Sequence, residues 1–471
     1  MFDADPILLA RIQFALNISF HILFPTITIA LGWFLVWLKI AHARNPSGPA
    51  MDVYRFWVKI FALSFALGVV SGITMSFQFG TNWPGFMEKV GNIAGPLLAY
   101  EILTAFFLAA VFLGIMLFGF NKVPNWAHTG ATLLVAIGTT MSAFWILVLN
   151  SWMHTPAGFE MRDGVAYATD WWAIVFNPSL PYRLAHTLVA SGLTVAFLIA
   201  GVSALRRLWG QRSPDITMGF RMGVGTAALL IPLQILIGDL HGHNTLEHQP
   251  QKVAAMEGNW ETGPNVPLLL FALPNEDTRS NDLAIGIPSG ASLILKWDAE
   301  GVIPGLNDFV AEDGTPLHPP VAPVFWSFRV MVATGMAMLA LSWWGAWRLR
   351  GGRSIDAMPR LGLVAFSAMA FSGWVATLAG WYTTEIGRQP WLVQGVLRTY
   401  EAAGPVGAGA IGSTLVLYLV VYAFLLAAYI GALLHLARQA GKGGPLPHAG
   451  TSPDAPVVAP SPASTFPSQA A

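Results

Sequence analysis

Two histidines, a glutamate and a methionine lie inside apolar stretches of this chain, where polar side chains are costly and are candidates for function. They are His21, Glu101, His186 and Met331. A histidine there can bind a metal or handle protons, and a carboxylate can carry protons, associate with iron or form a structural ion pair. A histidine and a methionine thioether that face each other can also hold a low-spin haem. Ordinary packing roles remain open for each of the four.

A second candidate group lies near the end of a later apolar stretch, in the run GWYTTEIGRQPW at 380–391. Glu385 and Arg388 are three residues apart, so on a helix they share a face and can pair. The structural alternative is an interfacial salt bridge inside an aromatic belt.

The composition restricts both the class of protein and its metal ligands. The chain has 471 residues, of which 54% are hydrophobic and 11% charged, too few charges for a soluble protein of this length. It has no cysteine, which excludes disulfides, iron–sulfur clusters and CxxCH haem attachment. Histidine, methionine and carboxylates therefore remain as ligands. The formal net charge is zero, so nothing indicates a nucleic-acid partner.

About nine apolar segments are long enough to cross a bilayer, which predicts an all-α polytopic membrane protein. The approximate spans are 12–39, 54–79, 95–120, 127–151, 182–205, 218–240, 324–349, 361–385 and 414–436. We divide the chain into six membrane helices within 1–240, a long polar loop at 241–323, three further helices within 324–440, and a tail at 441–471. The tail is rich in Pro, Ser, Ala and Gly, and we predict that it is disordered.

Basic residues gather on alternate connections, within 39–55, 206–221 and 348–360. The positive-inside rule then predicts that the N-terminus and the long loop lie outside and the C-terminus lies in the cytoplasm. In this topology the four candidates lie in the outer half of the membrane, with His186 and Met331 at similar depth. Periodicity alone does not establish that these two side chains face each other.

The chain resembles subunit I of cytochrome bd-type quinol oxidases along nearly its whole length, up to the tail. The matching runs are GRQPW at 387–391 with Glu385 just before it, NSWM at 150–153, FRVM at 328–331 and QKVAAME at 251–257. Their order, spacing and place on a nine-helix topology make the resemblance specific. The loop is similar in length to the short-loop class, which includes the cyanide-insensitive oxidases.

The resemblance implies three haems in a multi-pass protein of the bacterial cytoplasmic (inner) membrane. His186 and Met331 would be the axial ligands of a low-spin haem b, with Arg329 as a propionate or electrostatic partner. His21 and Glu385 would serve two high-spin haems, one a haem b and the other a haem d or a further haem b.

The same resemblance assigns Glu101 to the neighbourhood of the high-spin pair, and Trp381 and Arg388 to the surroundings of Glu385. In the loop, Glu257 would accept a proton from ubiquinol and Lys252 would be its hydrogen-bonding or charge partner. A solvated ion pair is the alternative for these two loop residues.

The implied reaction oxidises quinol at the outer face and reduces oxygen to water with cytoplasmic protons, which generates a proton-motive force without a pump. The implied partners are quinol, oxygen and a second membrane subunit, with or without a one-helix accessory subunit. One position departs from the family: a second glutamate usually follows two turns after the first, and here that residue is Ala109. Ser142 and internal water are candidate substitutes in the proton route.

Three other functions compete with this interpretation. A quinone-linked cytochrome b without oxygen reduction, or a haem–copper oxidase, would need more intramembrane histidines than the chain has. A proton-coupled transporter could use His21, Glu101 and Glu385 as a relay, and it would be colourless. The outer-loop histidines at 241, 243 and 248 are interpreted as solvated or loop-structuring rather than as a metal site.

Overall fold

The computed structural model describes residues 5–440, and the predicted disordered tail lies outside them. Nine helical segments in this part of the chain are long and apolar enough to cross a membrane, which confirms the predicted all-α polytopic class. They are α1 (Pro6–Arg44), α2 (Ala50–Thr81), α3 (Pro84–Leu103) continued by η1 (Thr104–Ala110) and α4 (Val111–Phe118), α5 (Asn125–His154), α7 (Leu180–Leu208), α8 (Pro214–His248), α11 (Val321–Arg348), α12 (Arg360–Ala368) with α13 (Ser372–Ile386), and α14 (Ala408–Gln439).

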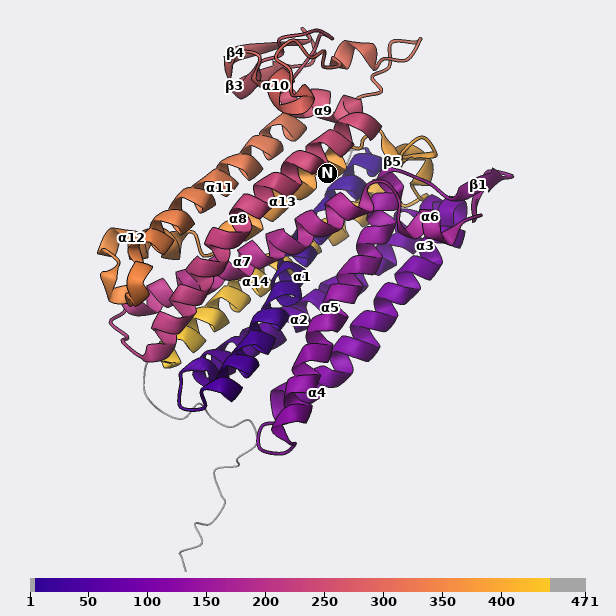
Figure 1. The fold of residues 1–471 in the computed structure, drawn as a ribbon. Helices are drawn as coiled ribbons and strands as arrows, with labels where there is room; N and C mark the ends of the chain where they lie inside the picture. Colours follow the sequence, from indigo (N-terminus) through magenta and orange to yellow (C-terminus); the bar gives the residue numbers. More distant parts are fainter. Residues whose placement is uncertain (1–4, 441–471) are drawn as a thin grey trace, which may run out of the picture.

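The helices form one elongated bundle, and the long connection between α8 and α11 covers one end of it (Figure 1). We call this end the loop end. Its short elements are β1 (Phe159–Arg162), β2 (Val165–Ala168), α6 (Trp171–Val175), α9 (Pro250–Glu257), β3 (Leu268–Asn275), β4 (Ser280–Ile287), α10 (Gly290–Lys296), η2 (Leu306–Asp308), β5 (Trp391–Val393), β6 (Leu397–Arg398) and η5 (Thr399–Ala402). Each strand pairs with its neighbour in sequence as an antiparallel hairpin. The opposite end carries η3 (Arg350–Gly352) and η4 (Ile355–Ala357).

Several helices extend beyond the apolar runs from which they were predicted. The third span begins at Pro84 rather than near residue 95, and α8 continues to His248 rather than ending near 240. Proline suits the first turn of a helix because the N–H it lacks would have no partner there. The apolar run measures only the part of a helix inside the bilayer, whereas backbone hydrogen bonding continues into the polar region. Glu101 therefore lies about five turns into its helical segment rather than two.

Two irregularities interrupt the spans. The third span contains a π-helical stretch, Thr104–Ala110, directly after the turn that carries Glu101. The eighth span breaks between α12 and α13, around residues 369–371. Such interruptions cost backbone hydrogen bonds, and in membrane proteins they occur where neighbouring helices cover the backbone.

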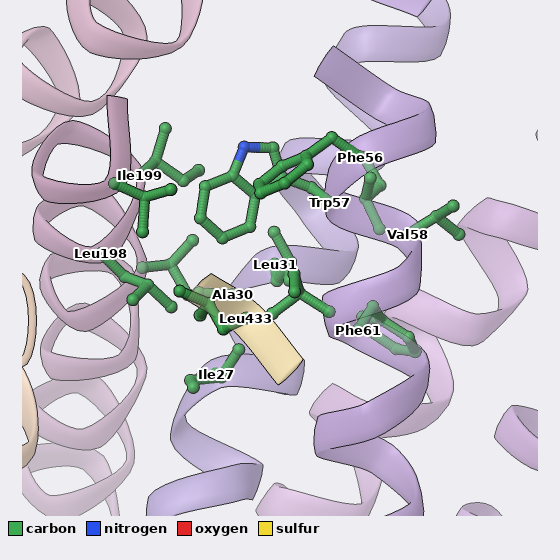
Figure 2. Close-up of a cluster of buried hydrophobic side chains, with 14 of the residues drawn as sticks. Ile27, Ala30, Leu31, Phe56, Trp57, Val58, Phe61, Leu198, Ile199 and Leu433 are labelled. Carbon is green, nitrogen blue, oxygen red and sulfur yellow. The ribbon is translucent and has the colours of Figure 1, made fainter. Parts of the chain in front are cut away.

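The best-packed region surrounds α1, which lies against α2, α5, α7 and α14. Figure 2 shows side chains from four helices meeting there, including Leu31 of α1, Trp57 of α2, Leu198 of α7 and Leu433 of α14. Lipid is as apolar as these side chains, so their contribution is close van der Waals packing rather than removal from water. This packing fixes α1 and α7, the helices that carry His21 and His186.

Candidate haem and quinol sites

The loop residues Lys252 and Glu257 are buried, with 2% and 5% of their surface exposed. Both lie on α9, a short helix that packs on α8 and α11 at the loop end. They are five residues apart, about 140° around a helix, so they project to different sides. A solvated ion pair between them is therefore wrong, because each side chain enters the protein and finds other partners.

Glu257 pairs with Arg329, whose Nη2 lies 3.3 Å from a Glu257 carboxylate oxygen. Burial raises the pKa of Glu257, and the guanidinium of Arg329 opposes the shift. Arg329 also donates from Nε and Nη2 to the carbonyl oxygen of Leu269, at 3.0 and 2.7 Å, and from Nη1 to that of Met256. Arg329 therefore joins α9, β3 and α11 around one buried carboxylate.

The side chain of Lys252 connects α9 to the end of α5. Its Nζ donates to Oε1 of Gln249 at 2.6 Å and lies 3.0 Å from Nδ1 of His154. Burial holds the pKa of Lys252 well below its usual range; Arg183 and Arg388 act in the same direction and Glu385 opposes them. Such an amine gives up its proton more easily than an exposed lysine does.

Glu385, at the end of α13, is the centre of the buried polar cluster. Its carboxylate lies 2.6 Å from Nη2 of Arg388, accepts from Asn150 at 2.9 Å and lies 3.3 Å from Nε2 of His154. Arg183 of α7 reaches the same cluster by donating to Asn150 at 3.2 Å. The predicted pair of Glu385 and Arg388 exists, with the side chain of Arg388 6% exposed and that of Glu385 17% exposed.

His186 lies on α7 and Met331 on α11. The side chain of each is next to a glycine of a neighbouring helix. A Cβ atom on Gly238 would lie 3.5 Å from Cε1 of His186, and one on Gly380 would lie 2.9 Å from Sδ of Met331. His186 Nδ1 is buried without a hydrogen-bond partner in the described residues. A ring nitrogen and a thioether that are both held beside glycine are suited to ligating a flat group.

His21 and Glu101 lie in different parts of the bundle interior. Nδ1 of His21 lies 3.0 Å from Oγ of Ser71 on α2, and the ring is next to Gly72. Glu101 accepts a hydrogen bond of 2.7 Å from Oγ of Ser142 on α5. Ser142, a candidate substitute in the proton route, therefore contacts the Glu101 carboxylate directly.

Ala109 lies in η1 and is fully buried against Gly138 of α5. A Cβ atom added at Gly138 would lie 2.9 Å from the Ala109 nitrogen, so the two backbones approach closely. The position that carries a second glutamate in the resembled family is therefore filled by close packing. Trp381 is half-buried on α13.

Haem propionates need buried cationic donors, and the polar cluster has them. Nε of Arg183 and both Nε and Nη1 of Arg388 are buried without hydrogen-bond partners between residues 5 and 440. Unsatisfied buried donors are unfavourable, so a bound anionic group would stabilise the cluster. The residues present therefore fit haem.

Sequence reasoning missed three members of this cluster, namely His154, Arg183 and Gln249. His154 directly follows the NSWM run, and Arg183 precedes His186 by one helical turn, so proximity to recognised residues was the available signal. The three histidines predicted to lie in the outer loop, at 241, 243 and 248, are in the last turns of α8 instead. The His243 ring accepts a hydrogen bond of 3.0 Å from Trp297, which connects the loop to the helix.

Comparisons with known proteins agree along nearly the whole chain. Residues 9–441 match the family described as cytochrome bd terminal oxidase subunit I. The chain is 34% identical to cytochrome bd ubiquinol oxidase subunit 1 of Bacillus subtilis, covering 91% of this chain and 92% of the relative. It is 32% identical to cytochrome bd-II ubiquinol oxidase subunit 1 of Escherichia coli, with 92% and 96% covered.

A solved structure, that of bd oxidase from Geobacillus thermodenitrificans, is similar with a TM-score of 0.85 and 30% identity, covering 93% of this chain and 100% of that one. Sequence and fold thus match over the same length, including the helices that carry the candidate residues. The chain belongs to the family of subunit I of cytochrome bd terminal oxidases, membrane enzymes of the quinol:oxygen oxidoreductase class.

Proposed function

We propose that this chain oxidises quinol at the loop end and carries the haems at which a terminal oxidase reduces oxygen to water. The observation that carries the proposal is the burial of Lys252 and Glu257 in separate polar networks, because a solvated loop would leave both exposed. The Lys252 network continues through His154 to Glu385, a predicted haem ligand. Substrate-side and haem-side residues are therefore in contact.

Glu257 is suited to accept a quinol hydroxyl proton because its raised pKa makes it a stronger base than an ordinary glutamate. Lys252 is suited to hydrogen-bond a quinol oxygen, and its low pKa lets it do so without a fixed charge. Ubiquinol is the substrate we propose, since the relatives from Bacillus subtilis and Escherichia coli are ubiquinol oxidase subunits.

His186 and Met331 would hold a low-spin haem b, and His21 and Glu385 would hold two high-spin haems, a haem b and a haem d or further haem b. When bound, these groups supply the electron transfer and oxygen chemistry. Glu101 would hold a proton on its carboxylate, and the Ser142 hydroxyl would orient that carboxylate.

The basic residues of the opposite end favour a cytoplasmic position for that end, with the loop end outside a bacterial inner membrane. Quinol protons would leave on the outer side, and protons for water would come from the cytoplasm, so a proton-motive force builds without pumping. The proposed assembly includes a second membrane subunit, with or without a one-helix accessory subunit. Unpaired apolar faces of α14 and of α3 to α4 are available for lipid or subunits.

The test is a reduced-minus-oxidised spectrum of the purified complex, with haem extraction and oxygen uptake on the same sample. Met331→Leu keeps the volume of the side chain but removes its thioether, so it should abolish the low-spin signal. Met336→Leu is the matched control, because Met336 is exposed on the same helix. A colourless protein with cofactor loss excluded would contradict the proposal and favour a transporter. Haem bands without oxygen uptake would favour a quinone-linked cytochrome b.

A further inference from the structure

The β3–β4 hairpin packs on the protein through part of β3 and leaves most of its apolar side chains exposed. Leu269 and Ala272 are buried against Phe325 of α11. Six apolar side chains of the two strands have 39–72% of their surface exposed, namely Leu270, Phe271, Leu273, Leu283, Ile285 and Ile287. We call these six together the outer hairpin face. A soluble loop would normally place polar residues there, because a contiguous exposed apolar patch marks an interaction surface.

The outer hairpin face adjoins a membrane-facing helix. Phe271 packs edge-on against Trp326 near the start of α11, with 5.1 Å between ring centroids. Farther along α11, the exposed side chains include Val330, Val332 and Met336. Figure 1 shows the hairpin just beyond the end of α11, at one side of the loop end. The apolar surface of the span thus continues onto the hairpin at the level where tryptophan marks a membrane interface.

Charge is arranged to match this position. The turn between the strands carries Glu276, Asp277 and Arg279, whereas Asp282 is the only charged residue within the two strands. The Glu276 carboxylate accepts a hydrogen bond of 2.8 Å from the backbone N–H of Val321, the first residue of α11. The turn is therefore hydrogen-bonded to the polar end of α11, while the apolar side chains of the strands are exposed on the protein surface.

Hydrogen bonds also connect the hairpin to the proposed quinol site. Arg329 donates to the carbonyl oxygen of Leu269 in β3 from Nε and Nη2, and Nη2 also donates to the carboxylate of Glu257. Phe271, a partly exposed member of the outer hairpin face, is two residues from Leu269 in the same strand. One side chain thus links the lipid-adjacent surface to the proposed proton acceptor.

We infer that the outer hairpin face rests in the boundary between headgroups and acyl chains of the leaflet at the loop end, where it forms the surface over which quinol passes from lipid to Glu257. Apolar side chains at that depth gain the favourable transfer from water that holds interfacial elements on membranes. The passage of quinol rests on the function proposed above, whereas the seating in lipid does not.

The absence of cysteine from the chain makes the seating measurable. Ile285→Cys would be nitroxide-labelled in the purified complex and reconstituted in phosphatidylethanolamine–phosphatidylglycerol vesicles, with the identically treated unsubstituted complex as the blank. We expect frequent collisions with oxygen, which concentrates in lipid, and few with a water-soluble nickel chelate. Glu312→Cys, on an exposed turn of the same loop, should show the opposite. Nickel access at 285 would overturn the inference, and protection from both reagents would overturn it by showing that protein covers the face.

A kinetic measurement tests the passage of quinol separately. Ile285→Asp should raise KM several-fold for a quinol with a long isoprenoid tail relative to a short-tailed, water-soluble one. Val302→Asp, an exposed aliphatic position outside the hairpin, should leave that ratio unchanged. An equal change for both quinols in Ile285→Asp would overturn the passage. Failure of Glu257→Gln to slow either quinol would instead contradict the proposed function and leave the label result standing.

Discussion

Nε2 of His154 lies 3.3 Å from the carboxylate of Glu385, so the last residue of α5 is in contact with a candidate haem ligand at the end of α13. The other ring nitrogen lies 3.0 Å from Lys252 Nζ and 3.1 Å from Gln249 Oε1. One fully buried imidazole therefore joins the loop segment to the haem-side cluster. His154 thereby fixes the position of the loop segment relative to the haem-side cluster through side-chain contacts alone.

His154→Ala should lower both turnover and stability, because it removes a partner from buried Lys252 and buried Glu385. An unsatisfied buried polar group costs about 1–3 kcal/mol, which thermal unfolding of the complex would detect. Oxygen uptake should fall several-fold, and a high-spin haem band should shift because Glu385 loses a neighbour. His154→Gln keeps a donor and an acceptor and should restore part of each. His435→Ala, in a pair with Gln439 on α14, is the control; an unaltered band in His154→Ala would contradict the positioning role.

The pH dependence of kcat/KM for quinol should reveal Glu257. Burial raises the pKa of this carboxyl, and the proton acceptor must be ionised, so activity should be lost as pH falls through a value above that of an ordinary glutamate. Glu257→Gln should lower the plateau and remove this acidic limb. Glu312→Gln, on the exposed turn, should retain it. An acidic limb that persists in Glu257→Gln would assign the titration to another group.

Ala109→Glu should destabilise the protein rather than restore a second carboxylate. The position is fully buried beside Gly138, and overpacking alone costs about 1–3 kcal/mol, to which the burial of an unpaired carboxyl adds. Reduced yield and a lower apparent melting temperature are expected, while Ala109→Ser should be tolerated. A well-folded Ala109→Glu enzyme with faster oxygen uptake would show that the helices can separate to admit the side chain.

The spans could be predicted because each is a run of apolar residues of bilayer length, a property local to the sequence. The same local property located Glu101 and His186, since polar residues are rare in such runs. Helix ends could not be placed as well. The last turns of α8, up to His248, are polar and carry no membrane signal, so the predicted end came too early. The orientation and the tail at 441–471 stay predictions.

The partners of the candidate residues could not be predicted, because they depend on contacts between distant parts of the chain. Nothing in the sequence near Lys252 indicates that it meets His154, 98 residues earlier. Glu257 read alone resembled a solvated carboxylate, and only the position of Arg329 on α11 explains its burial. The resemblance indicated the residues, and the packing of α5, α9, α11 and α13 supplies their partners.

The π-helical stretch after Glu101 has a consequence for comparing chains of this family. A π-turn accommodates an extra residue within a helix, so side chains beyond it are rotated relative to an uninterrupted α-helix. The angle around the helix axis between two positions on opposite sides of the stretch, such as Glu101 and Val111, then differs from the angle between residues ten apart in a regular α-helix. Residues that occupy equivalent places in space can therefore differ by one in number, and an alignment without a gap in this helix would pair the wrong side chains.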